Sequence, residues 1–153
     1  MVERLTAKQV FEYLRPDQVN AISEASDEIS FVAGETIYER GAPATDLFTV
    51  LKGGVELRLP GKGGISIVID QLSSGTMFGS CVCFHMDSYM LTAQCVEDSD
   101  LLKIKGSALK TLMDNDLMMG YSLQTRISTV YFNRYLETMN KLQAIVMNLP
   151  IQT

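Results

Sequence analysis

Residues 46–70 read DLFTVLKGGVELRLPGKGGISIVID, and this stretch decides the fold. Apolar residues alternate with polar or small residues in three runs, at 48–50, 55–59 and 65–69. A period of two residues is typical of short strands with one buried face. The residues PGKGG at 60–64 have the turn chemistry of a hairpin loop. The stretch therefore predicts short antiparallel strands joined by tight turns.

The same pattern continues on both sides of this stretch. Further short strands are expected at 29–32, 36–38, 77–78, 91–96 and 101–104. Helical spacing takes over before residue 28 and after residue 106, with Ser107 and Asn115-Asp116 as expected helix caps. We predict one α+β, mainly β domain over 1–153: N-terminal helices in 1–27, a double-stranded β-helix (jelly roll) over 28–105, and C-terminal helices in 107–149.

The last predicted helix is long and has two different apolar stripes. Its first half is expected to pack on the β-roll through Leu117, Tyr121, Leu123, Ile127 and Val130. Its second half has apolar residues at alternating spacings of three and four, which is a heptad pattern typical of helix pairing. We call this set the helix seam: Phe132, Tyr135, Met139, Leu142, Val146 and Leu149. A two-fold homodimer is expected, and a seam folded back on its own β-roll is the alternative.

Composition argues against several classes of function. The 153 residues have a net charge of -5, which favours neither nucleic acids nor acidic membranes as partners. No run of about 18 apolar residues predicts a membrane span, and the N-terminus lacks the apolar core of a signal peptide, so we expect a cytoplasmic protein. The single histidine, His85, argues against a catalytic triad or a multi-histidine metal site. We therefore expect a protein that is not an enzyme and has no cofactor or metal.

Four segments resemble the cyclic nucleotide-binding domain family. They are FVAGETIY at 31–38, GAPA at 41–44, LFTVLKGGVEL at 47–57 and GTMFG at 75–79. The family includes the catabolite activator protein, the regulatory subunit of the cAMP-dependent kinase and nucleotide-gated channels. The resemblance implies a regulatory module for signal transduction, in which an effector bound in the β-roll repositions the long helix.

The phosphate-binding cassette departs from the family pattern. That pattern is Phe-Gly-Glu followed nine residues later by Arg, where the Glu holds a ribose hydroxyl and the Arg pairs with the cyclic phosphate. In this chain Ser80 falls at the Glu position and Tyr89 at the Arg position, and residues 63–102 contain neither Lys nor Arg. Loss of the cation opposite a buried anion costs about 3–5 kcal/mol, which predicts an altered or lost effector site. The resemblance places that site at Phe78, Gly79, Ser80, Cys81, Val82, Tyr89, Met90 and Leu91.

Several alternatives stay open at this point. Tyr89 and its neighbours either line an apolar ligand site or plug the cavity, and Arg126 or Arg134 could supply a non-standard phosphate site for cAMP or cGMP. A structural scaffold is a further alternative. The three cysteines are expected to be small buried hydrophobic residues. Cys83 and His85 resemble the Cys-x-His of the carbon-monoxide-sensing branch, which makes a haem sensor the remotest alternative.

Only four residues follow Leu149. We therefore expect no helix-turn-helix DNA-binding domain in this polypeptide, and an output that lies on an unknown partner protein.

Overall fold

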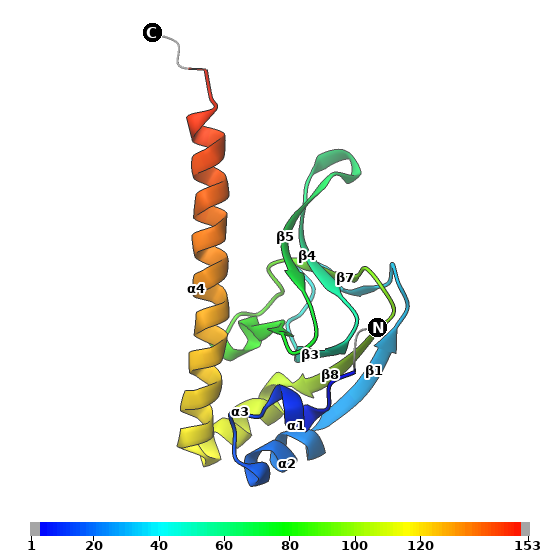
Figure 1. Ribbon diagram of the computed structural model, residues 1–153, viewed down its shortest axis with the longest axis vertical. Coiled ribbons are helices and arrows are strands. Elements are labelled where there is room, and N and C mark those ends of the chain that lie inside the picture. Colours follow the sequence, from blue (N-terminus) through cyan, green and yellow to red (C-terminus); the bar gives the residue numbers. More distant parts are fainter. Residues whose placement is uncertain (1–3, 151–153) are drawn as a thin grey trace.

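Two four-stranded antiparallel sheets form the centre of the computed structural model, which describes residues 4–150 (Figure 1). The first sheet has the strand order β1-β8-β3-β6 and the second has the order β2-β7-β4-β5. In chain order the strands are β1 Ser26–Phe31, β2 Thr36–Tyr38, β3 Asp46–Lys52, β4 Val55–Pro60, β5 Ser66–Leu72, β6 Met77–Phe78, β7 Thr92–Cys95 and β8 Ser99–Lys105. The predicted jelly roll is confirmed, with every expected strand present.

The two sheets enclose one apolar core, and the helices enclose a second. The core between the sheets consists of Phe48, Val50, Val55, Leu57, Leu72, Phe78, Ala93, Cys95 and Leu101. The second core lies where the helices α1 Ala7–Val10, α2 Pro16–Glu24 and α3 Gly106–Asn115 meet the first sheet and the start of α4 Leu117–Met147. Because strand residues alternate between faces, strands such as β3 contribute to both cores.

Two predictions about the helices need correction. The first of the N-terminal helices predicted in 1–27 is short: helical spacing of Val10, Phe11 and Leu14 favours one helix through all three, but α1 ends at Val10 and a turn places Phe11 and Leu14 in the core formed by the helices. Ser107 does not cap α3, whose N-cap is Lys105 and has no side-chain hydrogen bond. The second helix, α2, begins at Pro16 with Asp17 in its first turn, as the residue preferences of a helix start favour.

The long helix α4 begins as the sequence predicts but faces the protein in a different phase. The side chain of Asp116 accepts a hydrogen bond from the backbone N–H of Met119, which caps the helix. Gly120 then approaches α3 so closely that a Cβ would lie 3.0 Å from the carbonyl oxygen of Met113. This contact turns Met119, Leu123 and Ile127 inward, and it leaves Leu117 and Tyr121 exposed. The prediction that Leu117 and Tyr121 pack on the β-roll is therefore wrong.

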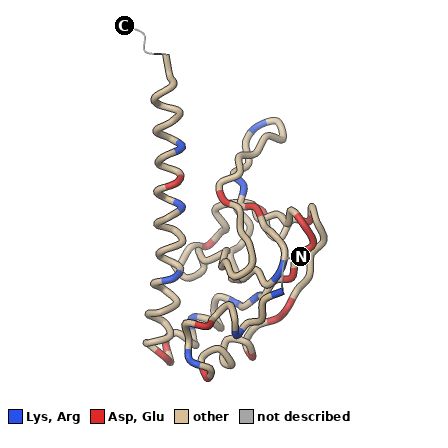
Figure 2. The backbone as a smooth tube through the Cα atoms, viewed as in Figure 1, with Lys and Arg blue, Asp and Glu red and all other residues tan. Residues whose placement is uncertain are grey.

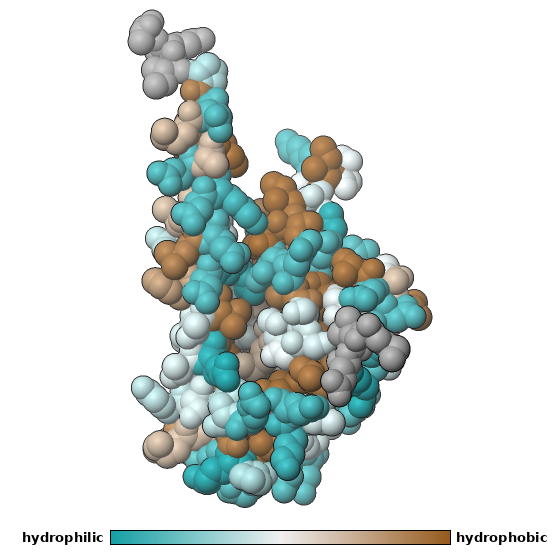
Figure 3. Space-filling view, in the orientation of Figure 1, coloured by the Kyte–Doolittle hydropathy of each residue, from teal (hydrophilic) through white to brown (hydrophobic). Residues whose placement is uncertain are grey.

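The second half of α4 extends past the β-roll (Figures 1 and 3). All six residues of the helix seam are 44–60% exposed, so the seam does not fold back on its own sheets. Between residues 128 and 149 the charged side chains are Arg134, Glu137 and Lys141 (Figure 2), and none of them is a seam position. None of the helices within residues 4–150 is long and apolar enough to cross a membrane.

Candidate functional site

The cassette begins with a sharp backbone turn at the end of β6. Gly79 has φ of 72°, in the left-handed region that favours glycine. A Cβ at this position would lie 3.0 Å from the carbonyl oxygen of Asp46, so the turn also needs the small residue. The chain then forms the short 3-10 helix η2 Ser80–Phe84, whose first two residues are buried. The GTMFG segment thus positions η2 over the end of the β-roll.

Tyr89, the residue expected at the position of the family's arginine, lies inside the β-roll. Its side chain is only 4% exposed. The hydroxyl donates a hydrogen bond to the carbonyl oxygen of Asp46 at 2.7 Å and accepts one from the Asp46 N–H at 3.0 Å. Burial raises the pKa of Tyr89, so the phenol is neutral and places no charge in the β-roll.

One aromatic ring stacks on Tyr89, and two further aromatic rings contact that stacked ring. The ring of Tyr38 stacks on that of Tyr89, with centroids 3.7 Å apart and an angle of 11° between the planes. Tyr38 also contacts Phe48 and Phe78, at centroid distances of 5.9 and 6.1 Å. Burial raises the pKa of Tyr38 as well. This end of the β-roll interior is therefore aromatic and uncharged.

Most of the residues expected at the site lie together. Phe78, Ser80, Cys81 and Tyr89 are buried, and Leu91 packs against the core between the sheets. Val82 is half-buried and packs against the helical core instead. Met90 is 54% exposed and does not join the group.

Tyr38 is a member of the site that the sequence reasoning missed. The one sequence signal for Tyr38 is its place in the short strand predicted at 36–38, in the segment FVAGETIY that resembles the family. Its stacking partner lies about fifty residues later in the chain, and the register between β2 and β7 shifts between Thr36 and Tyr38.

Of the two arginines considered as substitutes, Arg134 lies beside the β-roll. Its Nε is 3.1 Å from the Asp70 carboxylate on β5, and the two side chains are 13% and 24% exposed. The Arg134 guanidinium also lies 5.2 Å from the ring centroid of Tyr131, which meets Phe84 of η2 edge-on at 5.5 Å. These contacts join α4 to both β5 and η2. Arg126, in contrast, lies over the ring of Tyr13 near the N-terminal helices.

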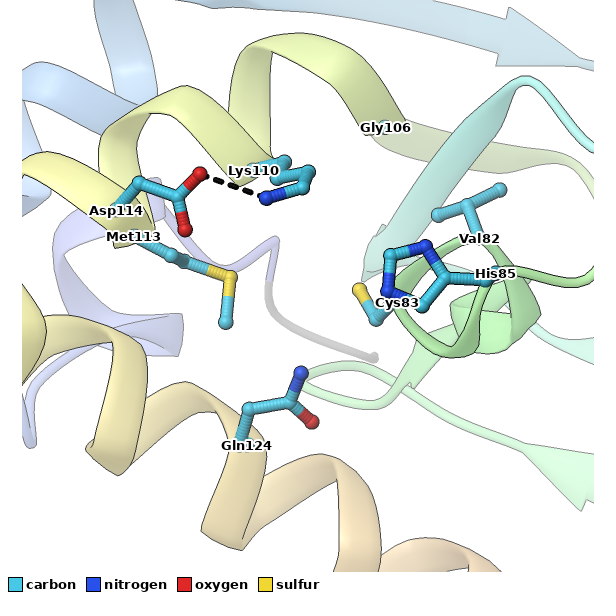
Figure 4. A pocket seen from close by; sticks show the side chains of 8 residues that line it. All are labelled: Val82, Cys83, His85, Gly106, Lys110, Met113, Asp114 and Gln124. Atoms are coloured by element: carbon cyan, nitrogen blue, oxygen red, sulfur yellow. Dashed lines mark hydrogen bonds and ion pairs between the residues drawn. The ribbon is translucent and has the colours of Figure 1, made fainter.

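Cys83 and His85 do not form a site that fits a haem. They face a cavity of about 230 Å³ between η2, α3 and α4, opposite Met113 and Gln124 (Figure 4). This volume is below the roughly 300–1,000 Å³ of most small-molecule sites. Burial, helped by Cys81, raises the pKa of Cys83 to about 11, so the thiol is protonated at neutral pH. Within residues 4–150 no three His, Cys, Asp or Glu side chains are grouped to hold a metal ion.

Comparison with known proteins agrees with this architecture. A search of curated proteins gives no match. A protein from Geobacter metallireducens described as cyclic nucleotide-binding is 24% identical, with a TM-score of 0.71 over 83% of this chain and 92% of its own. The c-di-GMP-responsive regulator CLP of Xanthomonas campestris is 17% identical, with a TM-score of 0.79 over 88% of this chain and 66% of its own.

The catabolite activator protein of Thermus thermophilus is 20% identical, with a TM-score of 0.73 over 90% of this chain and 62% of its own. The chain thus spans less than two thirds of this protein and of CLP, and likeness at these identities shows the fold. The family model of the cyclic nucleotide-binding domain matches residues 28–116, which is more than half of the chain. The chain therefore belongs to the cyclic nucleotide-binding domain family.

Proposed function

We propose that this protein is a non-catalytic regulatory module in which the usual effector site has been altered or lost. It acts on a partner protein through its long helix, and its own helix seam pairs two copies. The observation that carries the proposal is the burial of Tyr89 at the family's arginine position.

The β-roll interior is poorly suited to a cyclic phosphate. A buried phosphodiester keeps its charge and needs a cation or several well-placed N–H donors. The Tyr89 hydroxyl is already engaged with both backbone groups of Asp46, and its ring is stacked on Tyr38. The nearby cation, Arg134, is paired with Asp70. A cyclic nucleotide would have to displace these contacts before it found a charged partner.

The helix seam supports the second part of the proposal. Its residues 132–147 lie in α4 and span about 24 Å of helix, while Leu149 lies just beyond the helix end and not in the helix as predicted. The seam side chains lie open to solvent on the described chain. Exposed apolar surface of this length, with its charged residues on other faces, favours burial against an identical helix. In such a dimer the two copies of α4 would form a pair, and one cassette would lie on each side of this pair.

Pairing is tested by sedimentation of the wild type and of Leu142→Glu. We expect a mass near twice 17.0 kDa for the wild type and near 17.0 kDa for the variant, because a buried carboxylate is costly at the centre of the seam. Ala144→Glu adds the same charge two residues away, outside the seam, and should remain dimeric. A monomeric wild type, or a dimeric Leu142→Glu variant, would show that the seam does not pair two copies.

The altered effector site is tested by calorimetry with cAMP and cGMP. We expect no binding at micromolar concentrations by the wild type. Saturable micromolar binding would mean that the β-roll still works as a cyclic nucleotide receptor. If a broad effector screen by thermal shift also yields no stabilisation, a scaffold role is favoured over a sensor.

A further inference from the structure

A second cavity lies away from the β-roll interior, between the N-terminal segment, the loop before β6 and the middle of α4. Its volume is about 390 Å³, within the range of small-molecule sites. Apolar residues such as Val10, Phe11 and Met77 form part of its wall. The polar side chains of the wall are Tyr13, Thr76, Thr125, Arg126 and Thr129. Among residues 4–150 no carboxylate lines this cavity, although the chain as a whole has a net charge of -5.

One residue of the cavity wall has a buried hydroxyl group without a hydrogen-bond partner in the described structure. In the described part of the chain, the buried side-chain oxygen and nitrogen atoms without a hydrogen-bond partner are Tyr13 Oη and Ser74 Oγ. Tyr13 is in the cavity wall, and Ser74 directly precedes the wall residues Gly75 and Thr76. Buried polar groups without partners are rare and unfavourable, and an absent bound group is one explanation for them. The Tyr13 hydroxyl is therefore a hydrogen-bond donor that a ligand in this cavity could satisfy.

Arg126 supplies a positive charge that is not neutralised by the residues described. Its guanidinium carbon lies 4.1 Å from the ring centroid of Tyr13, above the ring. Within residues 4–150 it forms no ion pair, whereas Arg4, Arg15, Arg58 and Arg134 each pair with a carboxylate. A guanidinium in a cavity without carboxylates is suited to bind an anion with two oxygen atoms.

We propose that this cavity binds a small molecule with an oxyanion group, a phosphate or a carboxylate, held by Arg126 and by hydroxyl donors that include Tyr13. Because the Tyr13 hydroxyl is enclosed, the ligand reaches it only when neighbouring side chains move. Burial raises the pKa of Tyr13 to about 12, and the charge of Arg126 opposes part of this rise. The phenol is therefore protonated at neutral pH and available as a donor.

The threonines on α4 add a second feature of the ligand. The hydroxyls of Thr125 and Thr129 donate to the carbonyl oxygens of Tyr121 and Thr125, at 2.9 and 2.8 Å. Their remaining lone pairs can accept hydrogen bonds, so the wall suits a molecule that has hydroxyl or amine groups beside its oxyanion. Because the cavity joins α4 to the loop that leads into the cassette, a ligand there would contact both elements.

The proposal is tested by calorimetry with inorganic phosphate and, separately, with succinate, using the full chain at constant ionic strength. We expect saturable binding of at least one of the two, and the one that binds identifies the oxyanion. Arg126→Gln should weaken binding about tenfold or more, because it removes a charge-assisted hydrogen bond. Arg40→Gln is the matched control, since Arg40 is another exposed arginine without an ion pair in residues 4–150 and does not line the cavity.

Tyr13→Phe gives an independent readout with a nearly unchanged shape. Loss of an unsatisfied hydroxyl should raise the melting temperature of the free protein by about 2–4 °C and weaken binding at the same time. The proposal is overturned if neither anion binds, if Arg126→Gln binds as tightly as the wild type, or if Arg40→Gln weakens binding equally. These outcomes leave the sedimentation and cyclic nucleotide results untouched, so the two proposals fail separately.

Discussion

Replacement of Tyr89 by alanine tests whether this residue is part of the folded core. Removal of a buried aromatic ring costs about 3–5 kcal/mol of unfolding free energy, since the stacked ring of Tyr38 loses its partner. The backbone N–H and carbonyl groups of Asp46 also lose the hydroxyl that binds them, which adds about 1 kcal/mol or more. Tyr89→Ala should therefore lower the stability by about 4–6 kcal/mol.

Tyr89→Phe separates the hydroxyl from the ring. This variant keeps the stacking on Tyr38 and loses only the two hydrogen bonds with Asp46, so we expect a loss of about 1–3 kcal/mol. Met90→Ala is the control, because Met90 is 54% exposed and its removal should change the stability by less than about 0.5 kcal/mol.

Urea denaturation followed by circular dichroism measures all three values, provided that the slopes of the transitions agree. A Tyr89→Ala variant that loses less than about 1 kcal/mol would refute the reasoning, because the side chain would then lie in an open pocket instead of a packed core. Equal losses for the alanine and phenylalanine variants would show that the hydrogen bonds, and not the ring, hold this region.

Three further predictions concern the site and the caps of the helices. Ser80→Glu combined with Tyr89→Arg should create cAMP binding by calorimetry, and no heat would show that the shape of the β-roll interior has diverged as well as the cassette. Asp70→Asn breaks the ion pair with Arg134 and should lower the unfolding free energy by about 1–2 kcal/mol. It should also speed hydrogen exchange of the backbone amides in the adjoining turns of α4. Unchanged exchange would show that this ion pair does not hold the helix against the β-roll. The pKa of Asp116 is lowered, first by its hydrogen bond from Gln18. The Asp116 carboxylate therefore stabilises the fold fully above its ordinary pKa of 3.8, and this stabilisation is lost as the pH falls through the lower pKa of the folded state. In denaturation experiments at a series of pH values, Asp116→Asn should flatten this part of the curve of stability against pH.

The strands and turns could be predicted because their causes are local. The hairpin at 60–64 is confirmed, and Gly63 and Gly64 both have positive φ, as its turn chemistry requires. The cap at Asp116 is also a local feature and is confirmed. The phase of α4 could not be predicted, because it depends on the approach of Gly120 to Met113 on another helix.

Most of the residues expected at the candidate site lie together, but their geometry could not be read from the sequence. Counting along the cassette predicts that Ser80 and Tyr89 depart from the family pattern. Whether Tyr89 points inward depends on its long-range contacts with Tyr38 and with the backbone of Asp46, which no spacing in the sequence reveals. The pairing of Arg134 with Asp70, 64 residues apart, is hidden for the same reason.

The end of α4 extends beyond its contacts with the β-roll, so a small rotation at the base of the helix gives a larger displacement at its end. Its last contact with the β-roll described above is the pair of Arg134 with Asp70, and the helix continues to Met147, about 20 Å farther at 1.5 Å per residue. If the base of the helix tilts by about 10°, the tip moves by about 3–4 Å. A rotation of α4 that is too small to alter the packing around Ile127 would therefore produce a larger displacement at the end of the helix. A partner bound there would be in contact with a whole row of displaced side chains.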